Sequence, residues 1–131
     1  MGWRWVNRQA LLLLHAESLA EHGGAAGLRD AGLLDSALAR AQNLATYAQP
    51  DGQPDHAQLA AAYGFGLAKN PAFVDDHTHA AFLATGLFLA LNGYRLKTTQ
   101  ADATLTVLAL AAGEIDETAF ANWIRARSVK R

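Results

Sequence analysis

The 131-residue chain contains no cysteine, which excludes disulfides and zinc sites built on thiolates. Charged residues are also scarce, at 18%, and the formal net charge is only −1. Long-range electrostatics therefore favour neither a nucleic acid nor an anionic membrane as a partner. The lack of cysteine is compatible with a reducing cytoplasm, where we expect the protein to reside.

The sequence also lacks an apolar stretch long enough to span a membrane. Its run of four leucines, residues 11–14, is followed at once by His15 and Glu17, and no small-residue cleavage site comes after it. Apolar residues nevertheless make up 51% of the chain. This composition is typical of packed helices rather than of a disordered chain, and the length fits one domain covering residues 1–131.

Capping residues, glycines and prolines divide the chain into about six predicted helices, so the expected fold class is all-α. The predicted N-caps are Asn7, Asp30 or Gly32, Asp55, Thr98 or Thr99, and Asp116. The predicted fourth helix, residues 80–94, is apolar on almost every face, and we expect it at the centre of a compact bundle. Gly64 and Gly66 are poor helix-interior residues and predict a close approach between helices. Residues 3–5 and 94–97 are the only candidate strands.

Several aromatic and basic residues have plain structural interpretations. We expect His15 at the edge of the core, His22 at a helix end and His56 exposed in the first turn of its helix. The terminal segments that carry Trp3, Trp5 and Trp123 are expected to pack together and close the bundle. The basic C-terminus, residues 125–131, is interpreted as a solvated helix end.

One polar stretch, NPAFVDDHTHAAF at residues 70–82, interrupts the apolar chain just before the fourth predicted helix. Free N–H groups and the helix dipole at that position favour an anion such as phosphate. A carboxylate of Asp75 could hold Mg²⁺, and His77 or His79 could act as a general base. These are the components of a phosphoryl- or nucleotidyl-transfer site.

Two other interpretations of the same stretch stay open. Asp75 or Asp76 could simply cap the helix, with both histidines in solvent. Alternatively, His77 and His79 could bind a transition metal with Asp75. That pairing requires a loop, because residues two apart on a helix lie about 200° from each other round its axis.

Four blocks of the sequence resemble the Doc (death-on-curing) branch of the Fic-fold proteins. They are GLRDAGLLDSALARAQNLATY, LAAAYGFGLAKN, FVDDHTHAAFLATGLFLALNGYRL and LALAAGEIDETAFANWI. The resemblance runs from about Leu11 to Ile124 and implies the all-α Fic fold. It also implies transfer of a phosphoryl or AMP group from ATP, with Mg²⁺, to a hydroxyl of a target protein. For Doc-type toxins that target is a translation elongation factor, and a small antitoxin protein blocks the toxin.

The family's catalytic loop typically reads H-P-F-x-D-G-N-K-R after a Lys/Arg-Asn pair. In that register Phe73 matches, and Asp75 matches the acidic residue that holds the metal. Five functional positions differ, and they are occupied here by Pro71 for His, Asp76 for Gly, His77 for Asn, Thr78 for Lys and His79 for Arg.

These departures affect the expected chemistry. Pro71 has no basic group, Asp76 brings a negative charge to the phosphate position, and the cationic clamp is missing. The resemblance therefore implies a toxin homologue with reduced or lost standard activity. Two alternatives are an active transferase with a rearranged site, and a non-catalytic or metal-binding module. In the rearranged site, His77 or His79 would be the base, Asp75 would hold Mg²⁺, and Asp76 and Thr78 would lie at the phosphate position.

The glycine-rich segment GGAAGLRD, residues 23–30, is the second region that the resemblance marks. It corresponds to the flap that positions the target protein in the family, and Leu28 and Arg29 are the candidate target-binding residues there. The alternative is a plain interhelical loop.

Overall fold

Six α-helices account for most of the residues that the computed structural model describes, which are 2–22, 30–69 and 77–131, with the backbone alone at 22 and 77. They are α1 (Arg8–His22), α2 (Ala31–Tyr47), α3 (His56–Lys69), α4 (His77–Leu91), α5 (Gln100–Ala112) and α6 (Glu117–Arg127). A short 3₁₀ helix, η1 (Pro50–Gly52), and two three-residue strands, β1 (Tyr94–Leu96) and β2 (Ser128–Lys130), complete the fold. The predicted all-α class is confirmed. In the part of the chain described, no helix is long and apolar enough to cross a membrane.

The predicted helix boundaries follow from local hydrogen bonds. Asn7, Asp30, Asp55, Thr99 and Asp116 each accept a bond from the backbone N–H three residues later, at 2.8–3.1 Å. Each bond satisfies one of the N–H groups that a helix start leaves unpaired. Glycines with positive φ follow the C-terminal ends of α4 and α5, with φ of 85° at Gly93 and 80° at Gly113.

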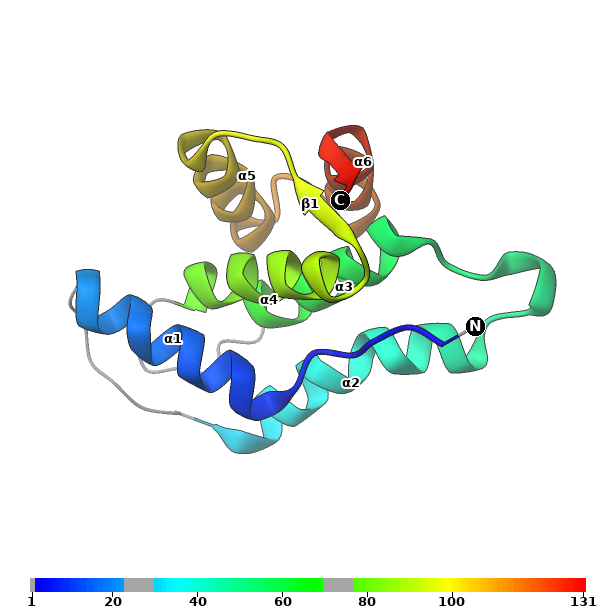
Figure 1. Ribbon diagram of the computed structural model, residues 1–131, viewed down its shortest axis with the longest axis horizontal. Coiled ribbons are helices and arrows are strands. Elements are labelled where there is room, and N and C mark those ends of the chain that lie inside the picture. Colours follow the sequence, from blue (N-terminus) through cyan, green and yellow to red (C-terminus); the bar gives the residue numbers. More distant parts are fainter. Residues whose placement is uncertain (1, 23–29, 70–76) are drawn as a thin grey trace.

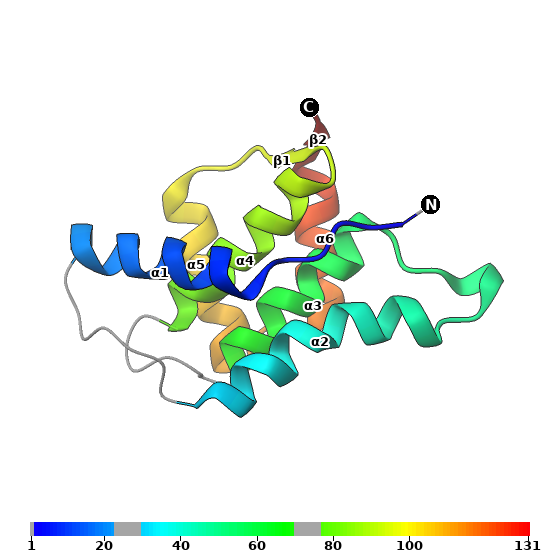
Figure 2. The same ribbon diagram turned by 60° about the horizontal axis from the view of Figure 1, so that its bottom comes forward.

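The helices α3 and α4 form the interior of the molecule. Figure 1 shows α1 and α2 on one side of this pair, and α5 and α6 on the other. The turned view in Figure 2 shows α2 running along α3. Of the two inner helices, α3 packs against α2, α4, α5 and α6, whereas α4 packs against α1, α3, α5 and β1.

The sequence predicts that α4 is the most buried helix, but in the structure burial is greater along α3. Ten of the 14 residues of α3 are buried, and most of them are alanine or glycine. Small side chains let neighbouring helices approach closely, as Gly64 and Gly66 predicted. A Cβ at Gly64 would lie 2.6 Å from Cε2 of Phe120 and 2.7 Å from Oγ1 of Thr85, and one at Gly66 would lie 3.3 Å from Cα of Ala37.

The N-terminal segment packs on α4 through two tryptophans. The rings of Trp3 and Trp5 lie 5.9 and 6.0 Å from the ring of Phe88. The amide of Asn92 holds the same segment, since it accepts from the backbone N–H of Arg4 at 2.8 Å and donates to its carbonyl at 2.9 Å. Residues 3–5 are therefore tied to α4 by side chains and do not form the strand that was considered.

The C-terminus differs from the solvated helix end that was expected. Residues 128–130 form β2, which pairs antiparallel with β1, and Arg95 lies opposite Val129. The other candidate strand, at 94–97, is thus confirmed as β1. Trp123 stacks on Phe120, with ring centroids 5.9 Å apart, so it packs within its own region rather than against the N-terminal tryptophans.

Candidate functional site at the beginning of α4

The polar stretch that the sequence placed in a loop is partly helical. Helix α4 begins at His77, three residues earlier than predicted, so Thr78 and His79 lie in its first turn. On this backbone, positions 77 and 79 lie about 200° apart round the helix axis. The geometric basis for one metal ion held by both histidines is therefore removed.

Thr78 and His79 line a pocket of about 360 Å³. Its volume is within the range of small-ligand sites, roughly 300–1,000 Å³. The other lining residues come from α4, from β1, from the segment between β1 and α5, and from α5, and they are Phe82, Leu96, Thr98, Thr99, Gln100, Thr104 and Val107. His79 is partly buried, and its ring centroid lies 6.4 Å from that of Phe82.

The N-terminal ends of two helices meet at this pocket. The first turn of α4 contributes Thr78 and His79, and the N-cap region of α5 contributes Thr98 and Thr99. Both helix dipoles direct their positive ends to this region, which favours an anionic ligand. Among the lining residues that the structure describes, however, His79 is the only ionisable one.

Internal hydrogen bonds already occupy two of the pocket hydroxyls. Thr99 Oγ1 accepts from the backbone N–H of Asp102 at 3.1 Å. Thr98 Oγ1 donates to Oδ2 of Asp102 at 3.0 Å, and the same oxygen accepts from Nε of Arg127 at 3.2 Å. These contacts cap α5 and tie its first turn to Arg127 at the end of α6.

Comparison with known proteins gives this pocket a context. The Fic/DOC family description matches residues 5–89, which include α1 to α3, residues 70–76 and most of α4. The chain belongs to the Fic/DOC family. It is also 43% identical to Toxin Doc of Mycolicibacterium smegmatis over 84 residues, which are 64% of this chain and 62% of that relative. This similarity supports the Doc branch of the family, and the matched region spans about six-tenths of the relative's length.

Some of the Fic/DOC residues predicted from the sequence can be placed and others cannot. Thr78 and His79 come together at the pocket. The side chain of His77 lies outside what the structure describes, and so do Asp75 and Asp76 of the predicted catalytic loop and Leu28 and Arg29 of the predicted flap. Among the described residues, no three His, Asp or Glu side chains are grouped so that they could hold a metal ion.

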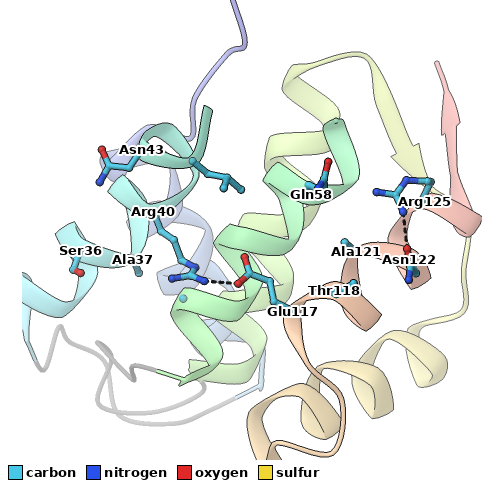
Figure 3. Close-up of a pocket in the computed structure, with 12 residues that line it drawn as sticks. Ser36, Ala37, Arg40, Asn43, Gln58, Glu117, Thr118, Ala121, Asn122 and Arg125 are labelled. Carbon is cyan, nitrogen blue, oxygen red and sulfur yellow. Dashed lines mark hydrogen bonds and ion pairs between the residues drawn. The ribbon is translucent and has the colours of Figure 1, made fainter. Parts of the chain in front are cut away.

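A larger hollow of this Fic/DOC chain, which sequence reasoning missed, lies between α2 and α6 (Figure 3). Its volume is about 710 Å³. It is lined by Ser36, Ala37, Arg40, Asn43, Leu44, Gln58, Gly66, Glu117, Thr118, Ala121, Asn122 and Arg125. None of these residues belongs to α4. The sequence carries no signal for this groove, because α2 and α6 flank it only after both pack on α3.

Every charged residue that lines this groove has a partner within the chain. Arg40 pairs with Glu117 across α3, and the guanidinium of Arg40 also lies 4.9 Å above the ring of Phe65. Arg125 donates to both carboxylate oxygens of Asp55, at 2.7 and 3.1 Å. These pairs connect α6 to α2 and to the N-cap of α3, so the described charges of the groove are explained by the fold.

The beginning of α3, beside this groove, is held on several sides. His56 was expected to be exposed, but it is partly buried and stacks on Tyr94 with ring centroids 3.9 Å apart. Its Nε2 lies 2.8 Å from Oγ of Ser128 in β2. The exposed interpretation was wrong because the β1–β2 pairing, which the sequence does not reveal, brings both partners to the ring.

Two pKa shifts accompany these contacts. Burial lowers the pKa of His56 below its ordinary value. Burial acts to raise the pKa of Asp55, but hydrogen bonds from Arg125 and from the backbone N–H of Gln58 outweigh it, so that this pKa lies below its ordinary value. The carboxylate of Asp55 and the neutral ring of His56 are therefore the favoured forms near pH 7.

Proposed function

We propose that this protein is a cytoplasmic Doc-type toxin homologue of a toxin–antitoxin system, with the family's standard transfer activity reduced or lost. Enzymes of this type transfer a phosphoryl or AMP group from ATP to a protein hydroxyl. The family match across residues 5–89 and the similarity to a protein named Toxin Doc support the first part of the proposal.

The observation that carries the second part is the set of residues around the beginning of α4. Pro71 stands where the family has its histidine base, and Thr78 and His79 stand where it has lysine and arginine. The described lining of the adjacent pocket contains no lysine or arginine. Without the family's histidine base, removal of the proton from the target hydroxyl is not assisted. Without the cationic clamp, the charge on a transferred phosphoryl group is not stabilised.

A transfer assay with labelled ATP and Mg²⁺ tests this proposal. The substrates are a bacterial lysate and a purified translation elongation factor, and the proteins compared are the wild type, Asp75→Ala and a restored loop. The restored loop carries Pro71→His, Asp76→Gly, His77→Asn, Thr78→Lys and His79→Arg. We expect little transfer by the wild type and at least a hundredfold more by the restored protein, because a positioned base alone contributes about 10²–10⁴-fold.

Two results would oppose the proposal in different ways. Robust labelling by the wild type that Asp75→Ala abolishes would show an active enzyme. An inactive restored protein that melts like the wild type would show that more than these five positions separates the chain from active relatives.

The pocket itself favours one alternative function, an active transferase with a rearranged site. Thr78 and His79 line a pocket of small-ligand size at two helix N-termini, where His77 or His79 would be the base and Asp75 would hold Mg²⁺. Binding of Mg²⁺–ATP should then raise the melting temperature, since ligand at a hundred times its Kd adds about 2.7 kcal/mol of stability. No shift at millimolar ATP would exclude ATP as the donor.

The proposed partners are a small antitoxin protein and, for any remaining activity, an elongation factor. The similarity to Toxin Doc supports an antitoxin, and growth of bacteria that express the chain provides the test. Growth arrest that co-expression of a neighbouring small open reading frame relieves would support a toxin–antitoxin pair. Stable co-purification without any growth arrest would support a protein that keeps the partner and has lost the toxic activity.

A further inference from the structure

The outer face of α5 carries an exposed apolar stripe, beside the exposed Thr104. Leu105 and Leu108 are 67% and 47% exposed, and Ala101 and Ala112 are exposed on the same helix. At 100° per residue these four positions fall within an arc of about 60° and form one stripe. Figure 1 places α5 at an outer edge of the molecule, with its packed side toward α3 and α4.

The order of side chains along this α5 stripe is symmetric. Reading forwards or backwards gives small, large, large, small, with spacings of four, three and four residues. A two-fold axis between Leu105 and Leu108 would therefore place Leu105 against Leu108 of a second copy. The same axis would place Ala101 against Ala112, where small side chains allow the helices to approach.

Charge is also compatible with self-association. The only ionisable residue within α5 is Asp102, which lies about 60° round the helix from Leu105, the nearest residue of the stripe. Its carboxylate is held by Thr98 and Arg127. No like charges would meet across a two-fold contact between two stripes, which is the requirement for a self-complementary interface.

We infer that the α5 stripe is a self-association surface that binds the stripe of a second copy of this chain in antiparallel orientation. The stripe is only about 16 Å long, so the contact is smaller than the roughly 1,200–2,000 Å² of a stable interface. The dimer should thus form at protein concentrations of about 0.1–1 mM.

Sedimentation equilibrium on charge variants tests both the surface and its orientation. Leu105→Lys alone and Leu108→Glu alone should each be monomeric, because each puts an unpaired charge against a leucine. In the antiparallel arrangement a mixture of the two should associate at least tenfold more tightly than either alone, since the introduced ammonium of one copy then meets the introduced carboxylate of the other. Leu13→Glu is the matched control, because Leu13 is 65% exposed on α1 and should leave association unchanged.

Cysteine cross-linking provides a second measurement, and the chain has no native cysteine to interfere. A mixture of Ala101→Cys and Ala112→Cys should form a disulfide-linked dimer under mild oxidation faster than either variant alone. A wild type that stays monomeric to about 1 mM would overturn the inference. So would association that Leu105→Lys leaves intact, or a mixture that associates no better than its components.

Discussion

Helices α3 and α4 are adjacent, similar in length, begin with histidine and carry glycine in their interiors, yet they serve different purposes. The beginning of α3 is tied to β1, β2 and α6 through His56 and Asp55. The beginning of α4 instead lines a pocket through Thr78 and His79. The contrast separates a histidine that stabilises the fold from histidines placed where chemistry is possible.

The interiors of the two helices also differ, in how closely other atoms pack around their glycines. In α3 the glycines face neighbouring helices, and a Cβ at Gly64 would collide with Phe120 and Thr85. In α4, a Cβ at Gly86 would meet nothing within 4 Å. Small size is thus a packing requirement in α3, whereas at Gly86 no neighbouring atom requires it.

The largest expected effect comes from matched glycine substitutions in the two helices. Gly64→Ala should destabilise the protein by about 1–3 kcal/mol, because the buried ring of Phe120 has to move. Gly86→Ala should stabilise it by about 0.5–1 kcal/mol, since alanine is the better helix former and the space is open. Urea unfolding of both variants measures the difference. Equal effects would mean that the close approach at Gly64 is not a packing constraint.

The next largest effect concerns the two helix beginnings. Asp55→Ala removes the N-cap of α3 and leaves Arg125 without its carboxylate, which should cost about 1–2 kcal/mol. Asp55→Asn keeps a capping oxygen and removes only the charge, so it should cost less than about 1 kcal/mol. Thermal unfolding compares the two. If asparagine is as harmful as alanine, the ion pair with Arg125 and not the cap is the main contribution.

The parts of this fold that were predictable are those set by local chemistry. The caps at Asp30, Asp55 and Asp116 follow from one side chain and the next turn, and the stop at Gly113 follows from the freedom of glycine to adopt a positive φ. Residues 94–97 were a candidate strand, but the pairing of β1 with residues 128–130 was not predictable, because three-residue strands carry almost no periodic signal. The interpretation of His56 failed with it, since both of its partners come from that sheet.

For the candidate site, sequence reasoning marked two side chains that the structure brings to one pocket, but it did not predict the geometry of that pocket. It marked Thr78 and His79 because they interrupt an apolar chain, and both line the pocket. It missed the contribution of Thr98 and Thr99, which are expected only as a helix start. Their proximity to α4 depends on how α5 packs, and no local pattern encodes that.

A smaller effect is expected from pH at the beginning of α3. Because burial lowers the pKa of His56 in the folded state, the unfolded chain binds the proton more readily. The contribution of the neutral ring to stability is complete above the ordinary pKa of 6.5 and is lost as pH falls below that value. The size of the loss is limited by solvent screening, since the side chain is partly exposed.

His56→Phe isolates this contribution. It keeps the stack on Tyr94 and removes the titrating group, so the free energy of unfolding should depend less on pH between about 7 and 5 than in the wild type. Asp55 does not interfere in this window, because its pKa lies below the ordinary value of 3.8. An unchanged pH dependence would show that other groups cause the loss.

The smallest effect on stability is expected at the beginning of α4. Thr78→Ala and His79→Ala should each change the free energy of unfolding by no more than about 0.5 kcal/mol, because both side chains are partly exposed at a pocket. Urea unfolding alongside Asp55→Ala gives the direct comparison between the two helix beginnings. A loss above about 1 kcal/mol in His79→Ala would place this histidine with His56 as a structural residue, and the pocket would lose its only described ionisable group as a candidate for chemistry.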